Sequence, residues 1–125
     1  MRYLLDTHTF IWFMSGDEQL PANIISEIKR KDNDCCISIA SLWEISVKIK
    51  IGKLEFPFEN AENFLLVNDI NILPVYFSHL RQLLLLDLIH RDPFDRIIIA
   101  QGISENLTIL TKDKNFKLYP CKWLW

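Results

Sequence analysis

The chain has 125 residues, of which 50% are hydrophobic and 24% are charged, so it is long and apolar enough to bury one core. The formal net charge of −2 argues against a protein that binds nucleic acid through overall basicity, and it leaves only local basic clusters for that purpose. We predict a single domain over residues 1–125.

The cysteines and the N-terminus indicate the compartment. Cys35, Cys36 and Cys121 are odd in number, include an adjacent pair and contain no CxxC, which is typical of neither a disulfide framework nor a zinc site. A reducing environment fits this pattern. Asp6 and His8 interrupt the N-terminus before a signal-type apolar stretch develops, and no later run approaches the roughly 18 apolar residues of a membrane span. We therefore expect a cytoplasmic protein without a membrane segment.

The first third of the chain alternates between strands and helices. Residues 2–5 (RYLL) predict a short buried strand, and residues 7–14 (THTFIWFM) predict a helix that ends near a Ser-Gly pair. Pro21 opens a second helix whose isoleucines share one face, and a polar loop begins at Lys29. Residues 35–40 (CCISIA) predict the second strand.

The middle of the chain continues the alternation. Residues 41–51 (SLWEISVKIKI) predict a helix, and residues 55–60 (EFPFEN) form a turn. Residues 61–68 carry apolar side chains at helical spacing, and residues 70–75 (INILPV) predict a third strand.

The last third supplies two more helices and the end of the sheet. Residues 78–89 predict a helix, and residues 92–106 predict another that is apolar on most of its circumference and therefore central. Residues 107–111 (LTILT) form a strand, and residues 119–125 form an edge strand because Pro120 is excluded from a sheet interior. The alternation predicts an α/β fold of three layers, α/β/α, around a central, mostly parallel sheet.

Four acidic residues occupy equivalent places in this scheme. Asp6 follows the first strand, Glu44 lies in the first turns of the helix after the second strand, Asp95 lies in the first turn of the central helix, and Asp113 follows the strand at 107–111. Sites in parallel sheets lie beyond the carboxyl ends of the strands, so we expect these acids to meet at one edge.

Carboxylates brought together in this way need a counter-charge. Two like charges about 4 Å apart repel by about 1 kcal/mol in water and by about 4 kcal/mol at an effective dielectric constant near 20. Hard oxygen ligands select Mg²⁺ or Mn²⁺, whereas zinc prefers histidine or thiolate. The pattern predicts a divalent cation at the acidic edge.

Each acid also fits a purely structural role. Asp92 is a good helix N-cap, Pro93 suits the first helical position, and Asp95 then falls at the third, where a carboxylate helps to satisfy free N–H groups. Glu44 completes a capping-box pattern that begins at Ser41. The other two acids suit a turn and a loop. Only the joint placement of the four favours a site.

Four blocks of the sequence resemble the PIN-domain family, and in particular the VapC-type toxins of prokaryotic toxin–antitoxin systems. Together the blocks cover nearly the full chain in the family's order, which makes the resemblance more specific than any single block. The blocks are LLDTHTFIW at 4–12, SIASLWEISVKIKIGKL at 38–54, HRDPFDRIIIAQ at 90–101 and LTILTKDKNF at 107–116.

The resemblance implies one PIN-like domain with an acidic pocket that binds Mg²⁺ or Mn²⁺. Asp6 and Asp95 would be the principal ligands, Glu44 and Asp113 would complete the shell, and Thr111 would line the pocket. The implied activity is hydrolysis of RNA phosphodiester bonds by metal-activated water, without a protein nucleophile. The implied partners are an RNA substrate, a cognate antitoxin that masks the pocket, and a second copy of the chain in a homodimer.

Other residues of the resembling blocks receive lesser roles. Asp92 and Arg96 match the family's DPFDR block, and we expect a cap from the first and a supporting or surface position for the second. Phe94 or Trp12 could stack on RNA bases, although core packing is the usual fate of aromatics in a small domain. The histidines share no ligand-like spacing, and we assign them no chemical role.

Basic residues close to the acids could hold RNA phosphates, and an ordinary solvated face is the alternative. They form two sets, which are Lys48, Lys50 and Lys53, and Lys112, Lys114 and Lys117. Two other functions are open: a PIN-like scaffold that binds RNA or protein without cleaving, and another Mg²⁺-dependent phosphoryl-transfer enzyme. An aspartyl phosphatase would more typically show DxD after the first strand, where this chain has DTH.

Overall fold

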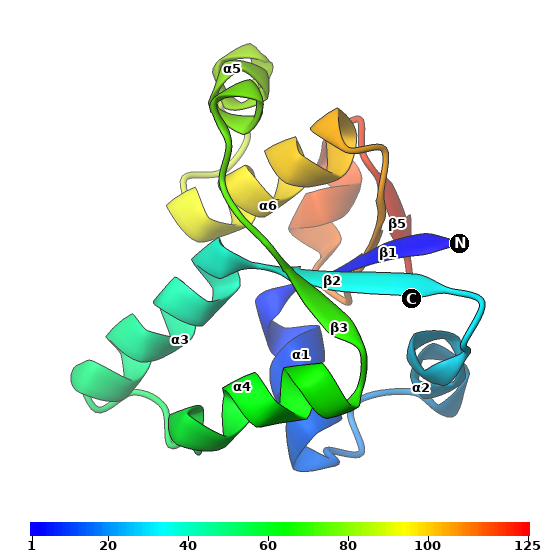
Figure 1. Ribbon diagram of the computed structural model, residues 1–125. Coiled ribbons are helices and arrows are strands. Elements are labelled where there is room, and N and C mark those ends of the chain that lie inside the picture. Colours follow the sequence, from blue (N-terminus) through cyan, green and yellow to red (C-terminus); the bar gives the residue numbers. More distant parts are fainter.

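The computed structural model describes residues 1–125, and its centre is a five-stranded sheet in which all the strands are parallel (Figure 1). The strand order is β3-β2-β1-β4-β5. The strands are β1 (Arg2–Leu5), β2 (Asp34–Ser38), β3 (Ile70–Leu73), β4 (Thr108–Leu110) and β5 (Lys122–Leu124).

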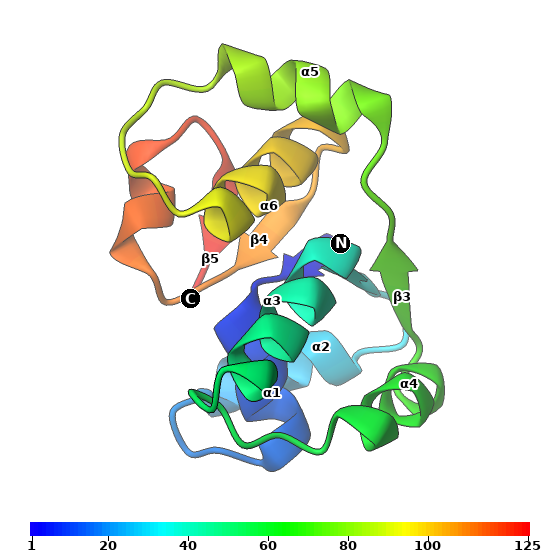
Figure 2. The same cartoon turned by 90° about the vertical axis from the view of Figure 1, so that its left-hand side faces the viewer.

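Helices cover both faces of the sheet. In the two views α1, α2 and α4 lie on one side, and α5 and α6 lie on the other (Figures 1 and 2). The three-layer α/β/α prediction is confirmed. The helices are α1 (Thr7–Ser15), α2 (Ala22–Lys29), α3 (Ile39–Lys50), α4 (Phe58–Val67), α5 (Phe77–Leu85), α6 (Pro93–Ser104) and the short 3₁₀ helix η1 (Lys114–Leu118).

Two apolar cores lie on the two faces of the sheet because successive strand residues point in opposite directions. In β1, Tyr3 and Leu5 join the core that contains Phe10 of α1. Leu4 joins the other core, which includes Phe116 of η1. Both faces of β1 are therefore buried, which explains its continuous run of apolar residues.

The junction between β2 and α3 differs from the predicted one. Ser38 ends the strand and caps the helix, and its side chain accepts a hydrogen bond from the Ala40 N–H (3.0 Å). Ile39 and Ala40 therefore belong to α3 and not to a strand ending at residue 40. The capping box proposed for Ser41 and Glu44 is wrong, because both residues lie inside the helix.

Two other helix boundaries were also misplaced. The helix predicted over 78–89 ends at Leu85, where the backbone of Leu86 becomes extended and its side chain turns into the core around α6. Helix α4 begins at Phe58, three residues before the predicted start, with Pro57 preceding it. The predicted edge strand is confirmed, and it begins after Pro120.

The register of the sheet brings the ends of three strands together. Leu5 of β1 is paired with Ile37 of β2 on one side and with Leu110 of β4 on the other. The Asp6 N–H donates to the Leu110 carbonyl (3.2 Å), which extends this alignment one residue beyond β1. Asp6 and Thr111 consequently leave the sheet side by side.

Candidate functional site

Asp6 is the most deeply buried of the predicted acids. It caps α1 by accepting a hydrogen bond from the Thr9 N–H (2.8 Å), and its side chain also bonds that of Thr111. Only 4% of Asp6 is exposed. Burial raises the pKa of its carboxyl group above the usual value, while the hydrogen bonds from Thr111 and Thr9 oppose part of the rise.

Glu44 is held on α3 by two partners. Thr7, the residue after Asp6, donates its hydroxyl hydrogen to Glu44 Oε1 at 2.7 Å, since a carboxylate only accepts. Lys48, one helical turn along, places Nζ 2.9 Å from Glu44 Oε2. Glu44 is buried. A hydroxyl and an ammonium group thus stabilise a carboxylate that has little contact with water.

Asp92 and Asp95 begin α6 with different roles. Asp92 is the N-cap, and its carboxylate accepts hydrogen bonds from the Phe94 N–H (2.9 Å) and the Asp95 N–H (3.1 Å). Asp95 makes no cap bond of this kind, and its side chain is 19% exposed. The prediction that Asp92 caps the helix agrees with this geometry, and the assignment of Asp95 as a metal ligand stays a prediction.

The pKa of Asp95 reports what surrounds it. Burial raises the pKa of this carboxyl group, and the negative charges of neighbouring acids raise it further, to about 8. Asp92, which caps the same helix, has the largest effect among these neighbours, and Asp113, Glu44 and Asp6 come from other elements of the fold. The other three predicted acids therefore act electrostatically on Asp95 at one edge of the sheet.

Asp113 and Thr111 complete this edge after β4. The Thr111 hydroxyl accepts a hydrogen bond from the Asp113 N–H (3.0 Å), and the Asp113 carboxylate caps η1 by accepting from the Asn115 N–H (2.9 Å). An open pocket of about 350 Å³ lies here, lined by Asp6, His8, Trp12, Lys112 and Asp113.

The donor set of this edge fits a divalent cation in its chemistry. Carboxylates and a hydroxyl are the hard oxygen ligands that Mg²⁺ and Mn²⁺ prefer, and burial together with the charges of neighbouring acids raises the pKa of Asp95. No three His, Cys, Asp or Glu side chains are grouped closely enough to hold one ion in this arrangement. Each of Asp6, Glu44 and Asp113 is instead bonded to a local partner. Shared coordination of one ion would require these side chains to come closer together than they are here.

Arg96 supports the site from inside the molecule. The side chain is buried, and Nη1 donates to the Asp87 carbonyl (2.8 Å) and to the Tyr119 hydroxyl (3.1 Å). These hydrogen bonds connect α6, which carries Asp95, to Asp87 in the loop before it and to Tyr119 in the segment after η1. Of the two positions predicted for Arg96, the supporting one is observed.

The predicted basic residues are not equivalent in their placement. Lys48 is paired with Glu44, and Lys112 lines the open pocket with its Nζ 5.9 Å from the Trp12 ring centroid. Lys117 lies over the Trp123 ring instead. The remaining three, Lys50, Lys53 and Lys114, are exposed.

Three residues near the acids were missed from the sequence. Thr7 is a buried polar residue at the start of α1. Because it directly follows Asp6 in the sequence, its proximity to the acids could have been inferred. His90 Nε2 lies 3.4 Å from Asp95 Oδ2. The spacing between His90 and the other histidines gave no sign of this contact. Trp43 is 63% exposed beside Glu44 and stands edge-on to Phe94 at a ring-centroid distance of 5.1 Å.

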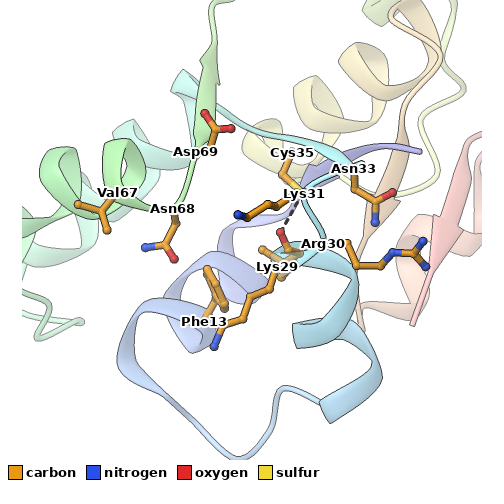
Figure 3. A pocket seen from close by; sticks show the side chains of 10 residues that line it. Phe13, Lys29, Arg30, Lys31, Asn33, Cys35, Val67, Asn68 and Asp69 are labelled. Carbon is orange, nitrogen blue, oxygen red and sulfur yellow. Dashed lines mark hydrogen bonds between the residues drawn. The ribbon is translucent and has the colours of Figure 1, made fainter.

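A larger hollow lies elsewhere and contains none of the acids. This pocket of about 480 Å³ is formed near the starts of β2 and β3, where side chains such as Lys29, Lys31, Asn68 and Asp69 surround it (Figure 3). The amino ends of parallel strands form the opposite edge of the sheet from the acids. We take the acidic edge as the candidate site because its charges converge, and volume alone indicates no chemistry.

Two general features complete the description. The three cysteines, Cys35, Cys36 and Cys121, are all free thiols. None of the helices is both long enough and apolar enough to cross a membrane.

The fold and its acidic edge define a class of α/β proteins with carboxylates gathered beyond the ends of parallel strands. The family model described as PIN domain matches residues 3–120, and the chain therefore belongs to the PIN domain family. This result confirms the family resemblance and covers all four predicted acids.

Solved structures show the same fold. VapBC2 from Rickettsia felis, in a structure bound to a DNA fragment from its promoter, superposes with a TM-score of 0.75 at 18% identity, covering 99% of this chain and 98% of that one. VapBC-1 from nontypeable Haemophilus influenzae gives a TM-score of 0.71 at 18% identity, covering 99% and 97%. No curated protein matches the sequence.

Proposed function

We propose that this protein is a metal-dependent ribonuclease and the toxin of a toxin–antitoxin pair. The observation that carries the proposal is the electrostatic environment of Asp95, whose pKa is raised to about 8 by burial, by Asp92 at the start of the same helix, and by acids from three other segments of the chain. Like charges gathered at a sheet edge are costly for a protein that has no cation to place among them. Membership of the PIN domain family points to a nuclease.

Asp6, Glu44, Asp95 and Asp113 would hold Mg²⁺ or Mn²⁺. When bound, such an ion lowers the pKa of coordinated water and polarises the scissile phosphate. Thr111 orients Asp6 and the backbone of Asp113. These residues position the reacting groups, and the chain supplies no covalent nucleophile.

RNA is the substrate class that the surroundings of the acids favour. Trp43, which is exposed, and Phe94, which is half-buried, form an aromatic pair next to Glu44 and Asp95 in the sequence, and unpaired bases stack on such side chains. Lys48 and Lys112 carry positive charge at the same edge and could contact phosphates there. Lys50, Lys53 and Lys114 would have a lesser role because they are exposed without contacts to the acids.

The proposed protein partners are an antitoxin and a second copy of the chain. Both structural neighbours are VapBC proteins, and the sequence blocks resemble VapC-type toxins. Exposed leucines along and after α5 provide apolar surface of the kind that partners cover, with Leu84 exposed at 86% and Leu88 at 82%. An antitoxin that masks the acidic edge would keep the enzyme inactive.

The ribonuclease proposal is tested with purified protein and a single-stranded RNA. We expect cleavage with Mg²⁺ or Mn²⁺, no cleavage in chelator, and loss of cleavage in Asp6→Asn and Asp95→Asn variants that keep the wild-type circular dichroism spectrum. Asp32→Asn is the matched control, because Asp32 is exposed and paired with Arg30 away from the acids. Full activity in chelator would exclude the metal, and a folded, metal-loaded protein that leaves RNA intact would favour the scaffold alternative.

The aromatic pair is tested separately from the metal. Trp43→Ala removes an exposed side chain, so stability should change little while the KM for RNA rises. Trp123→Ala, another exposed tryptophan, which is on β5, is the matched control. An unchanged KM in the Trp43 variant would exclude stacking at this position.

The toxin proposal needs a cellular test. Induced expression of the chain should arrest growth, Asp95→Asn should not, and a small neighbouring gene should relieve the arrest. Harmless expression of a protein that is an active nuclease in vitro would leave a ribonuclease that is not a toxin.

A further inference from the structure

The Tyr119 hydroxyl lies at the centre of a hydrogen-bond network behind Asp95. It is 3.2 Å from the backbone N of His90, 3.1 Å from Arg96 Nη1 and 2.8 Å from His90 Nδ1. Tyr119 itself is 5% exposed, so water has little access to this network. The three residues come from the segment after η1, the loop before α6, and α6.

The hydrogen atoms of this network have one consistent arrangement. A tyrosine hydroxyl has one hydrogen to donate. The His90 N–H and the Arg96 guanidinium are donors only, so neither of them can accept that hydrogen. The hydroxyl hydrogen must then go to His90 Nδ1, which makes Nδ1 an acceptor.

An acceptor at Nδ1 determines the tautomer of the neutral ring. The imidazole hydrogen is then on Nε2, and Nε2 is the atom that faces Asp95 Oδ2 at 3.4 Å. Tyr119 therefore aims an N–H donor at the carboxyl group, whereas the other tautomer would place two acceptors against each other when Asp95 is ionised.

We propose that His90 and Tyr119 are positioning residues for Asp95, which goes beyond the proposed function but rests on its assignment of Asp95 as a metal ligand. His90 holds Oδ2 of the carboxylate, and Oδ1 has no hydrogen-bond partner and is left for the metal. Tyr119 keeps His90 in the tautomer that can do so, and Arg96 holds Tyr119. This role falls to a histidine whose spacing in the sequence had given no sign of a function.

The position of the network explains why Asp95 needs it. Asp6, Glu44 and Asp113 are each held by a hydrogen bond from the backbone or a hydroxyl group, but Asp95 accepts none from the backbone. His90 is the one hydrogen-bonding partner that its side chain has in the structure. Loss of a partner that orients a metal ligand typically costs about 10–100-fold in metal affinity or activity.

The tautomer is measured directly by long-range ¹H–¹⁵N NMR of the histidine rings in the metal-free full chain, above about pH 8, where Asp95 is ionised. We expect His90 to carry its hydrogen on Nε2 in the wild type and to lose this preference in Tyr119→Phe, which removes only the hydroxyl. Tyr76→Phe is the matched control, because Tyr76 is exposed and its hydroxyl is outside this network. An Nδ1–H tautomer in the wild type would overturn the inference, whatever the protein's activity.

The effect on Asp95 is measured by Mn²⁺ binding, followed by electron paramagnetic resonance, and by cleavage of RNA. His90→Phe and Tyr119→Phe should weaken Mn²⁺ binding about 10-fold or more, and His90→Gln, whose amide can replace the Nε2–H donor, should recover most of it. Equal weakening in His90→Gln and His90→Phe would reduce His90 to a packing role and overturn the inference. Failure of the wild type to cleave RNA would overturn the proposed function alone, since the tautomer and the Mn²⁺ titration do not depend on cleavage.

Discussion

Replacing Asp95 by asparagine should stabilise the metal-free protein at alkaline pH. In the unfolded chain this carboxyl group ionises near its ordinary pKa of about 3.9, whereas in the fold burial and neighbouring acids raise the pKa to about 8. Between these values the folded state retains a proton that the unfolded state has released. The stability of the wild type must therefore fall as the pH rises through this range, and the cost is complete above about pH 8.

The magnitude follows from the size of the shift. Each pKa unit corresponds to about 1.4 kcal/mol, so a rise of about four units sets an upper limit near 6 kcal/mol. Asp95 is 19% exposed, and screening by water reduces this limit severalfold. The ionised carboxylate also recovers about 0.3–1 kcal/mol from the N-terminus of α6. We expect Asp95→Asn to gain about 1–3 kcal/mol at pH 8.5 and almost nothing near pH 4.

The assay is urea denaturation in chelator at several pH values between about 4 and 8.5. Asp32→Asn provides a control of opposite sign, because the guanidinium of Arg30 lowers the pKa of Asp32 and its loss should not stabilise the protein at high pH. Mg²⁺ or Mn²⁺ should flatten the pH dependence of the wild type and leave that of Asp95→Asn unchanged. A variant that is no more stable than the wild type at pH 8.5 would refute the electrostatic account of the site.

Two further substitutions test the packing around the site. Gly102→Ala in α6 should destabilise the fold by about 1–3 kcal/mol in urea unfolding, because the new Cβ would lie 2.7 Å from Ile109 Cδ1, and this overpacking exceeds the gain in helix propensity. Adding Ile109→Val should recover part of the loss, and strict additivity of the two effects would exclude the clash. Thr7→Val should cost about 1–3 kcal/mol in thermal unfolding because it leaves Glu44 without its hydroxyl donor, whereas Thr7→Ser should lose much less. An undiminished stability in Thr7→Val, which removes the hydroxyl and keeps a methyl group, would exclude a stabilising role for the hydroxyl donor.

The elements were predictable from local patterns to different degrees. The apolar run of residues 2–5 and the Asp92-Pro93 start of α6 carry strong local preferences, and both were located correctly. The boundary at Ser38 was not, because Ser38 and Ser41 are both acceptable caps and the choice depends on how β2 is paired with its neighbours. The end of α5 depended in the same way on Leu86 entering the core around α6.

The candidate site also has features that could be predicted from the sequence and features that could not. The positions of Asp6, Glu44, Asp95 and Asp113 after strands or early in helices were readable from the sequence, because the carboxyl ends of parallel strands meet at one edge. Their assignment as metal ligands remains a prediction. The pairing of Glu44 with Thr7 was not readable, because these side chains meet only after α1 packs on α3.

The sequence by itself determined the type of each element, the separation of apolar from polar faces, and the edge at which the acids gather. Those features follow from backbone sterics, capping and the periodicity of side chains along a helix or strand, all of which act over a few residues. Tertiary structure alone decided the sheet order, the partner of each carboxylate, and the contact of His90 with Tyr119 and Asp95. The bond between His90 and Tyr119 joins segments 29 residues apart, and its directional geometry exists only once both have docked against α6.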